Sequence, residues 1–181
     1  EPDKRAQAWT IRLRPGVTFH NGKPVTADDV LFSLRRITDP KDPKTGAASI
    51  GYMDLDRSRK LDNRTVRIQL KFPNVAFPDD LGQYFNSIVP TDYDPARPVG
   101  TGPFMYESFV PGERSVFKKN PDYWREGLPR VDEVVIIDFP EDTPRVNALL
   151  SGQVDAITDL PAGQIAQVKS NDQFKVLISE T

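Results

Sequence analysis

Hydrophobic and polar residues alternate with a period of two near the start of the chain. Trp9, Ile11 and Leu13 are apolar and the residues between them are polar, which is the pattern of a strand with one buried face. The Pro15-Gly16 pair then predicts a turn, because proline presets φ and glycine accepts a positive φ. We expect the apolar face of this strand to pack within the first half of the chain.

The pattern then changes to the period of a helix. Val30, Leu34 and Ile37 recur at a spacing of three or four residues and form one apolar face. Thr26 stands at the expected N-cap, and Asp29 follows three residues later in the capping-box position. These residues predict an amphipathic helix that begins just after Thr26.

A second alternating stretch runs from Val66 to Leu70 and is preceded by a turn at Asp62-Asn63. Residues 61–72 are therefore predicted to form a hairpin or strand pair, and the first strand is expected to pack on it or on the helix. The mixed-charge segment before it, residues 53–60, is expected to be solvated surface.

A short helix is predicted from Pro78, with Leu81, Tyr84 and Phe85 packing inward. Two strands are predicted farther along, over residues 104–109 and 115–119, because a Pro-Gly turn separates two stretches of strand-like composition. The strongly apolar residues 133–139 predict a third strand.

The last part of the chain reads as alternating helices and strands. Thr143 is the expected N-cap of a helix with Pro144 at its first position. Residues 154–157 are predicted to form the strand that follows, which would complete a parallel strand–helix–strand crossover. A helix over 161–168 and a strand over 174–178 are predicted after it.

Composition removes several classes of function. The 181 residues carry a formal net charge of −2 and no cysteine. No strong electrostatic field therefore calls for a nucleic-acid partner, and a disulfide, a zinc-thiolate site and a cysteine nucleophile are excluded. Residues 1–8 lack the apolar core of a signal peptide, and no apolar run is long enough to cross a membrane. The chain is expected to fold with a core and a solvated surface.

Catalysis is disfavoured by the residues available. His20 is the only histidine, and a turn-stabilising role explains it better than a catalytic triad does. The paired acids Asp28-Asp29 and Asp79-Asp80 are explained by helix starts, and the acidic residues between 39 and 54 lack the spacing of a calcium loop. We therefore predict no catalytic residue, no metal site and no cofactor.

The opening strand–turn–helix resembles the family 5 extracellular solute-binding proteins, the dipeptide, oligopeptide and nickel receptors of bacterial ABC importers. The matching residues in this chain are Trp9, Leu13, Arg14, Gly16, Val17, Phe19, Gly22, Pro24, Thr26, Ala27, Asp29, Val30, Phe32, Ser33, Leu34 and Arg36. Further matches lie at residues 98–104 (PVGTGPF), 120–124 (NPDYW) and 143–155. The resemblance thus extends over nearly the whole chain.

This resemblance implies a mixed α+β and α/β fold that forms part of lobe I of a type II periplasmic-binding-protein-like fold. We expect an α+β subdomain over residues 1–99 and an α/β part over 100–181, with the second lobe absent from the chain. Whole family members have several hundred residues in two lobes around a cleft, and they normally carry a further strand and helix before the region of Trp9.

The same resemblance implies capture of peptides or a similar small solute between the lobes and delivery to membrane permeases. It implies a monomer in the periplasm or a cell-surface lipoprotein, with membrane association only through permease subunits or a lipid anchor outside this segment. Two alternatives remain open: an interaction or structural module that docks a membrane partner, and a hydrolase.

Candidate ligand-binding residues follow from the family's cleft. Gly100, Thr101 and Gly102 are the first candidates, because small residues let a ligand approach the backbone closely. Arg97 just before them is a candidate partner for an anion, with an exposed loop as the alternative. Tyr84 is a candidate for the apolar wall, with core packing as the alternative.

Overall fold

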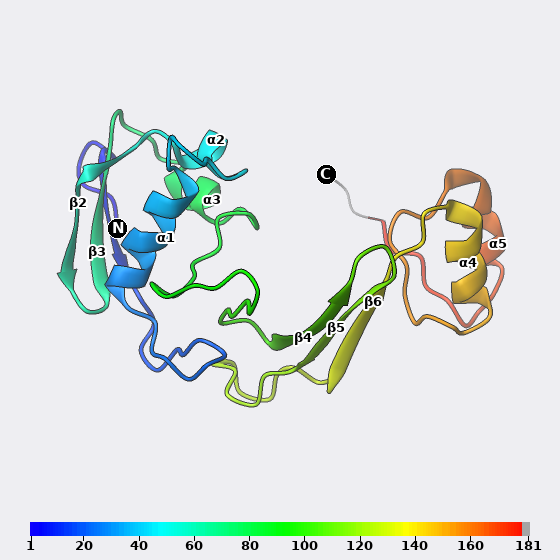
Figure 1. Ribbon diagram of the computed structural model, residues 1–181. Coiled ribbons are helices and arrows are strands. Elements are labelled where there is room, and N and C mark those ends of the chain that lie inside the picture. Colours follow the sequence, from blue (N-terminus) through cyan, green and yellow to red (C-terminus); the bar gives the residue numbers. More distant parts are fainter. Residues whose placement is uncertain (179–181) are drawn as a thin grey trace. The chain divides into compact units, whose positions relative to one another are not determined.

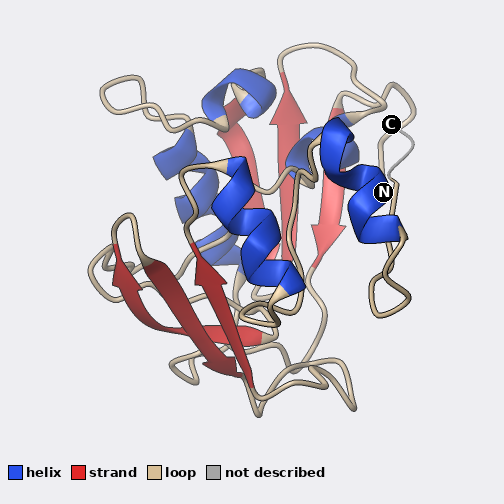
Figure 2. Ribbon diagram, turned by 90° about the vertical axis from the view of Figure 1, so that its right-hand side faces the viewer, coloured by secondary structure: helices blue, strands red, loops and turns tan. Residues whose placement is uncertain are grey.

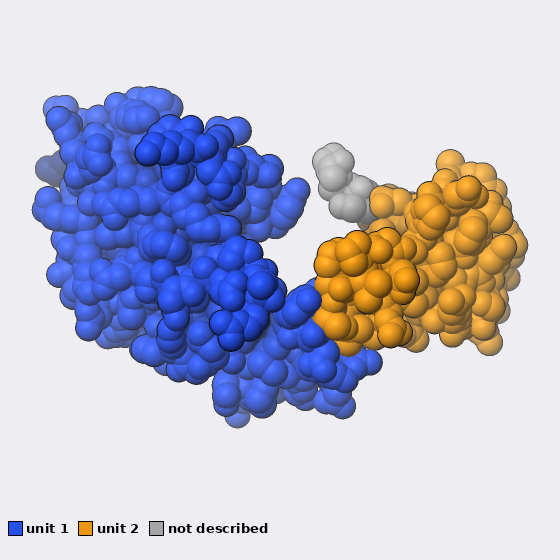
Figure 3. Space-filling model, in the orientation of Figure 1, with its two compact units in different colours: residues 1–107, 117–134 blue, residues 108–116, 135–181 orange. Residues whose placement is uncertain are grey.

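The structure, a computed structural model, describes residues 1–178. It divides into two compact units, which are coloured separately in Figure 3. Unit 1 comprises Glu1–Glu107 and Phe117–Val134, and unit 2 comprises Ser108–Val116 and Val135–Thr181. The subdomain boundary expected at residues 99 and 100 stays a prediction.

Unit 1 contains a three-stranded antiparallel sheet in the order β1-β3-β2 (Figure 1). The strands are β1 (Ala8–Arg12), β2 (Met53–Asp62) and β3 (Thr65–Leu70). In the register of β1 on β3, Trp9 is opposite Ile68 and Ile11 is opposite Val66. The expectation that the first strand packs within the first half of the chain, on the second alternating stretch or on the helix, is therefore confirmed.

Helix α1 (Ala27–Ile37) lies alongside this sheet (Figure 1) and presents its apolar face to it. Val30, Leu34 and Ile37 are buried. The predicted capping box is present, because the Asp29 carboxylate accepts hydrogen bonds from the backbone N–H of Thr26 at 2.8 Å and from its hydroxyl at 2.7 Å. This geometry satisfies a helix donor that would otherwise have no partner.

The core of unit 1 is formed by the facing sides of the sheet, α1 and two short helices, α2 (Ala47–Ile50) and α3 (Phe77–Leu81). Its buried members are Ala27, Val30, Leu31, Leu34, Ile37, Ile50, Met53, Val66, Ile68, Leu70 and Phe77. Trp9, Ile11 and Leu13 are partly buried against this cluster. The alternation that opens the sequence thus describes one face of a real core.

Two expectations about unit 1 are wrong. Residues 53–60 are not merely solvated surface, because they form most of β2 and bury Met53 and Ser58. The backbone of this polar segment pairs with β3, and such pairing overrides a weak strand preference. Tyr84, expected to pack inward, is 86% exposed.

A second three-stranded sheet contains β4 (Phe104–Val110), β5 (Arg114–Lys119) and β6 (Glu133–Ile137) in the order β4-β5-β6. Both sheets are drawn in red in Figure 2. The N–H of Lys119 donates to the carbonyl of Asp132, and the N–H of Asp138 donates to the carbonyl of Glu113. Residue numbers rise along β6 as they fall along β5, so the two strands are antiparallel. All three predicted strands are confirmed.

The helices of unit 2 are α4 (Asp142–Leu150), the 3₁₀ helix η1 (Ala162–Gln164) and α5 (Ile165–Lys169). Val146, Leu149 and Val168 form the buried centre of their apolar cluster. The N-cap of α4 is Glu141 rather than the expected Thr143. Proline is compatible with this start, because the first-turn N–H groups have no partner within the helix.

The strands expected over 154–157 and 174–178 are not formed, and the parallel crossover that depended on the first is also wrong. Val154, Ile157, Phe174 and Val176 are instead partly buried against the helical cluster of unit 2. Apolar residues in a short segment predict that it has side chains to bury, whereas a strand also needs a neighbouring backbone to pair with. Neither segment has such a neighbour within residues 1–178.

Within residues 1–178, no helix combines the length and the apolar character needed to cross a bilayer. In the same part of the chain, no group of three or more His, Cys, Asp or Glu side chains is placed to hold a metal ion.

Candidate functional site

The candidate loop Gly100–Gly102 belongs to unit 1 and is tied to the turn that contains His20. The backbone N–H of His20 donates to the carbonyl of Gly100 at 2.8 Å. The N–H of Gly100 donates in turn to Nδ1 of the His20 ring at 3.1 Å, and Nε2 lies 3.0 Å from the carbonyl oxygen of Gly102. Because Nδ1 accepts, the proton of the neutral ring is on Nε2, which donates to Gly102.

Asn120, which follows β5, holds the same loop from a second direction. Its side-chain amide donates to the Gly102 carbonyl at 3.0 Å, and its backbone N–H donates to the Pro103 carbonyl at 2.8 Å. The residue is buried, with 5% of its surface exposed. The Gly102 carbonyl therefore receives two side-chain hydrogen bonds from residues far apart in the sequence.

Several polar groups of the loop remain available. Among hydrogen bonds within residues 1–178, none involves the backbone N–H or C=O of Thr101, its hydroxyl, or the N–H of Gly102. The three residues are partly exposed. The Gly102 carbonyl is thus held by hydrogen bonds. The N–H groups of Thr101 and Gly102 and the carbonyl and hydroxyl of Thr101 have no partner within residues 1–178.

The two glycines of the loop are not required by the local packing. Neither Gly100 nor Gly102 has a positive φ. A Cβ added at Gly102 would meet nothing within 4 Å, and one added at Gly100 would first meet the His20 ring at 3.6 Å, an ordinary contact. Within the described residues, space for a side chain therefore exists at both positions.

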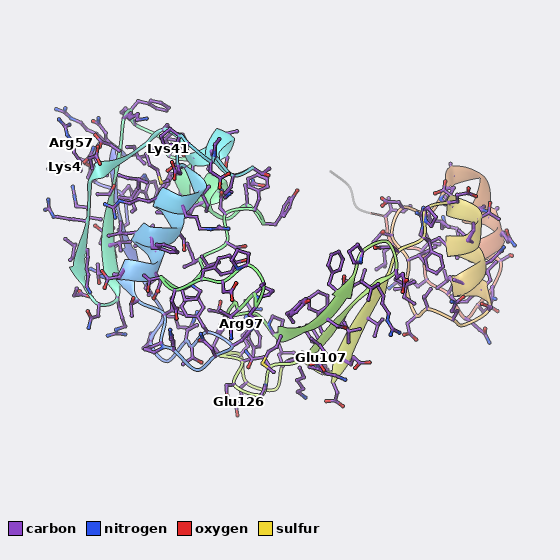
Figure 4. All side chains as sticks on the ribbon, in the orientation of Figure 1. Lys4, Lys41, Arg57, Arg97, Glu107 and Glu126 are labelled. Carbon is purple, nitrogen blue, oxygen red and sulfur yellow. The ribbon has the colours of Figure 1, made fainter. Side chains whose placement is uncertain are left out.

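Arg97 is paired with a residue of its own loop. Its Nε donates to the Asp94 carboxylate at 3.0 Å, and its side chain is 87% exposed (labelled in Figure 4). The N–H of Ala96 and then the Arg97 guanidinium hold the pKa of Asp94 below its ordinary value. An anion that bound Arg97 would have to compete with Asp94, so its role in ligand binding stays a prediction.

Tyr84 lies in the segment after α3, and its ring packs edge-on against Phe85 with a centroid distance of 4.9 Å. At 86% exposure it contributes little to the core. Neither its hydroxyl nor the Arg97 side chain hydrogen-bonds to the loop Gly100–Gly102 within the part that the structure describes. The five candidates therefore do not form one hydrogen-bonded group.

The residues that organise the loop, His20 and Asn120, were not among the predicted site residues. His20 was expected to stabilise a turn, and its ring in fact joins that turn to a loop 80 positions later. Both residues lie in segments that match the family pattern, at residues 9–36 and 120–124. The family match could therefore have drawn attention to His20 and Asn120. Their positions in the sequence do not reveal that both hydrogen-bond to the loop Gly100–Gly102.

The sequence matches a protein-family model along its whole length. The model is described as the bacterial extracellular solute-binding proteins, family 5 Middle, and the match covers residues 1–181. The di/tripeptide-binding protein 2 of Pseudomonas aeruginosa is 32% identical over 93% of this chain and 37% of its own length. The heme-binding protein A of Haemophilus influenzae is 29% identical over 94% of this chain and 36% of its own length. The chain thus spans little more than a third of the length of these relatives.

The chain is also similar to solved structures of binding proteins. The binding protein AgaA of Agrobacterium tumefaciens R10, solved with agropinic acid, is 35% identical with a TM-score of 0.89, over 95% of this chain and 36% of that one. The binding protein DppA of Helicobacter pylori, solved with the peptide STSA, is 27% identical with a TM-score of 0.81. The match covers 95% of this chain and 39% of that one. The chain therefore belongs to family 5 of the bacterial extracellular solute-binding proteins.

Proposed function

We propose that the chain is the middle part of the solute-binding component of a bacterial ABC importer. The observation that supports this most strongly is the family match, which extends over residues 1–181. The protein would capture its solute outside the cytoplasm, in the periplasm or as a cell-surface lipoprotein, and deliver it to permease subunits as a monomer. It would have no catalytic activity of its own.

The solute class that we propose is a short peptide or a small amino-acid-derived acid. Relatives named as di/tripeptide-binding and glutathione-binding proteins and the neighbour solved with agropinic acid support this choice. Such solutes share carboxylate and amide groups, which backbone N–H and C=O groups recognise by hydrogen bonding.

A thermal-shift screen of the full-length protein tests this function. The screen would include dipeptides, tripeptides, glutathione and agropinic acid, with heme and a nickel–histidine complex as members of other classes. We expect stabilisation by one of the peptide-like or acidic solutes, because a ligand that binds only the folded state raises its stability. Stabilisation by heme or nickel alone would contradict the solute class, and no response to any compound would contradict the function.

We expect the 181-residue chain without further segments to fold but to bind solute more weakly than micromolar affinity. Family members bind between two lobes, so one lobe alone supplies only part of the contacts. Isothermal titration of the segment and of the full-length protein with the solute found by the screen would measure the difference. Affinity of the segment equal to that of the full-length protein would show that the expectation is wrong.

Within this function, we propose that Gly100–Gly102 forms part of the solute site and that His20 and Asn120 position it. Their hydrogen bonds hold the Gly100 N–H and the Gly102 carbonyl, which leaves the Thr101 and Gly102 N–H groups free for a carboxylate or a peptide carbonyl. The unfilled space at Gly102 supports this role, because a missing Cβ lets another backbone approach. Arg97 and Tyr84 would belong to the outer part of the site.

Replacing Gly102 by alanine tests this proposal. The change should leave the free energy of unfolding within about 1 kcal/mol of the original, because the backbone φ is compatible with alanine. Solute affinity of the full-length protein should fall about tenfold or more, since the new methyl would stand where the solute approaches. Chemical denaturation and titration calorimetry measure the two effects.

Gly163→Ala is the matched control, because Gly163 also lacks a positive φ and a neighbour within 4 Å of an added Cβ. It should change neither stability nor affinity appreciably. Unchanged affinity of the Gly102 variant would remove the loop from the solute site while leaving the importer function intact.

A further inference from the structure

The ring of His20 lies between two groups of one loop that require opposite hydrogen-bonding roles. Its Nδ1 accepts the backbone N–H of Gly100 at 3.1 Å, and its Nε2 lies 3.0 Å from the carbonyl oxygen of Gly102. Only the neutral ring with its proton on Nε2 satisfies both groups. The other neutral tautomer would direct a proton at the Gly100 N–H and a lone pair at the Gly102 carbonyl.

A protonated His20 ring cannot keep both contacts. The imidazolium carries a proton on each nitrogen and has no acceptor, so its Nδ1–H would face the N–H of Gly100, with the two nitrogens 3.1 Å apart. Turning the ring over changes nothing, because both nitrogens are then donors. The charged ring can keep its bond to the Gly102 carbonyl only if the Gly100 N–H moves away from it.

The loop Gly100–Gly102 depends on His20 for most of its hydrogen bonds. The backbone N–H of His20 also donates to the Gly100 carbonyl at 2.8 Å, so backbone and ring together make three contacts. Within residues 1–178, the one other hydrogen bond to the loop comes from the Asn120 amide to the Gly102 carbonyl. Loss of the ring contact at Gly100 therefore removes one of the four hydrogen bonds that hold the loop.

The turn that carries the ring is held more firmly than the loop. Phe19, next to His20, is only 2% exposed. Its N–H donates to the Lys23 carbonyl at 2.8 Å, and its carbonyl accepts the N–H of Gly22 at 2.8 Å. Thr18 and Pro24 form an antiparallel bridge across the same turn. When the ring and the Gly100 N–H repel each other, we therefore expect the loop to move and the turn to stay.

Charged side chains near the ring do not offset this repulsion. Within residues 1–178, none of them forms a hydrogen bond or an ion pair with the His20 ring. The charged residues on the three segments around the ring are Lys23 in the turn, Arg97 before the loop and Asp122 after Asn120. Lys23 forms an ion pair with Asp92, and Arg97 forms one with Asp94. No carboxylate at ion-pairing distance therefore stabilises the imidazolium within the part that the structure describes.

We propose that His20 is a pH-sensitive latch, whose protonation releases the loop Gly100–Gly102 from the turn at residues 18–24. A histidine free of such contacts becomes charged as the pH falls through about 6.5. The closed loop binds no proton at His20 and the open loop binds one, so acid favours the open loop. The closed loop is thus fully favoured above this pH, and the ratio of open to closed loop rises about 30-fold between pH 7.5 and pH 5.0.

Amide hydrogen exchange of the full-length protein at pH 7.5 and pH 5.0 would measure the latch. The protection factor of the Gly100 N–H, corrected for the ordinary effect of pH on exchange, reports the ratio of closed to open loop. We expect it to fall about 30-fold at the lower pH. The N–H of Leu70, which donates to the Gln7 carbonyl at 2.8 Å in the same unit, is the internal reference. An equal fall at Gly100 and Leu70 would mean that acid opens the whole unit, and it would overturn the proposal.

Two variants separate titration of His20 from its hydrogen bonds. His20→Asn keeps an acceptor, because the Asn Oδ1 has the same place relative to Cβ as Nδ1, and it cannot be protonated in this range. Its Gly100 protection factor should be equal at the two pH values within about twofold. His20→Gln keeps a donor for the Gly102 carbonyl without that acceptor, so its Gly100 protection should be low at both. A 30-fold fall in His20→Asn would contradict the latch. If His20→Asn does not fold, the comparison of Gly100 with Leu70 in the original protein still decides.

The effect of the latch on solute binding rests on the function proposed above. Because the proposed solute site includes Gly100–Gly102, the affinity of the full-length protein should fall in acid by at most about 30-fold, and it should fall less in His20→Asn. Calorimetry with the compound that stabilises the protein in the thermal-shift screen would measure this. If exchange shows the latch and the affinities of both proteins depend equally on pH, the loop does not belong to the solute site. If no compound binds, the proposed function fails, whereas exchange at Gly100 still decides on the latch.

Discussion

Replacing Phe77 by alanine is expected to lower the free energy of unfolding of unit 1 by about 3 to 5 kcal/mol. The Phe77 side chain is fully buried. Its ring lies 5.9 Å from that of Trp9 and 6.3 Å from that of Tyr52, measured between centroids. Truncation would remove these contacts and leave a cavity that the short helix α3 and the edge strand β1 can fill only by moving.

Urea denaturation followed by tryptophan fluorescence would measure this loss. Both tryptophans, Trp9 and Trp124, belong to unit 1, so the signal reports on that unit. Val75→Ala is a suitable control, because Val75 is a nearby apolar residue that is 80% exposed, and its change should stay within about 0.5 kcal/mol. A similar loss in both variants would mean that Phe77 is not part of a packed core.

Replacing Asp29 by alanine should destabilise unit 1 by about 2 to 4 kcal/mol. The residue is 5% exposed. One carboxylate oxygen caps α1 through Thr26, and the other accepts the backbone N–H of Thr91 at 2.9 Å. Alanine would therefore remove the capping box and also release the segment that follows Val89 from the start of the helix.

Asp28→Ala separates this effect from the general preference for negative charge at a helix N-terminus. Asp28 is the adjacent residue in the same first turn, and its carboxylate is 2.6 Å from the Lys60 ammonium at the surface. An exposed pair of this kind contributes about 0 to 1 kcal/mol. Equal destabilisation by the two changes in urea denaturation would contradict the role assigned to Asp29.

The local elements of unit 1 were largely predictable because their signals act over a few residues. A capping box needs only Thr26 and Asp29, and the structure confirms it. The alternation at Trp9 and Ile11 identified the strand face that packs, partly buried, against the core for the same reason. In contrast, β2 was missed because its charged residues resemble surface, and the neighbouring β3 is what makes that segment a strand.

The candidate site could be predicted only in part, because its contacts join residues that are far apart in the sequence. Gly100, Thr101 and Gly102 were chosen for their small size, but the residues that hold this loop, His20 and Asn120, were not chosen with them. Their hydrogen bonds to Gly102 cross 82 and 18 positions of the sequence. Only the folded chain brings such donors and acceptors within 3 Å of each other.

The sequence by itself determined the family of this protein, the capped helix α1 and the residues that face the core of unit 1. These features depend on residue types at fixed short spacing, which folding cannot rearrange. The tertiary structure alone decided which segments pair as strands, and it left residues 154–157 and 174–178 without a strand partner. It also brought His20 and Asn120 together on the Gly102 carbonyl. Strand pairing and long-range hydrogen bonds require a specific partner, and the identity of that partner is set by the position of the whole backbone.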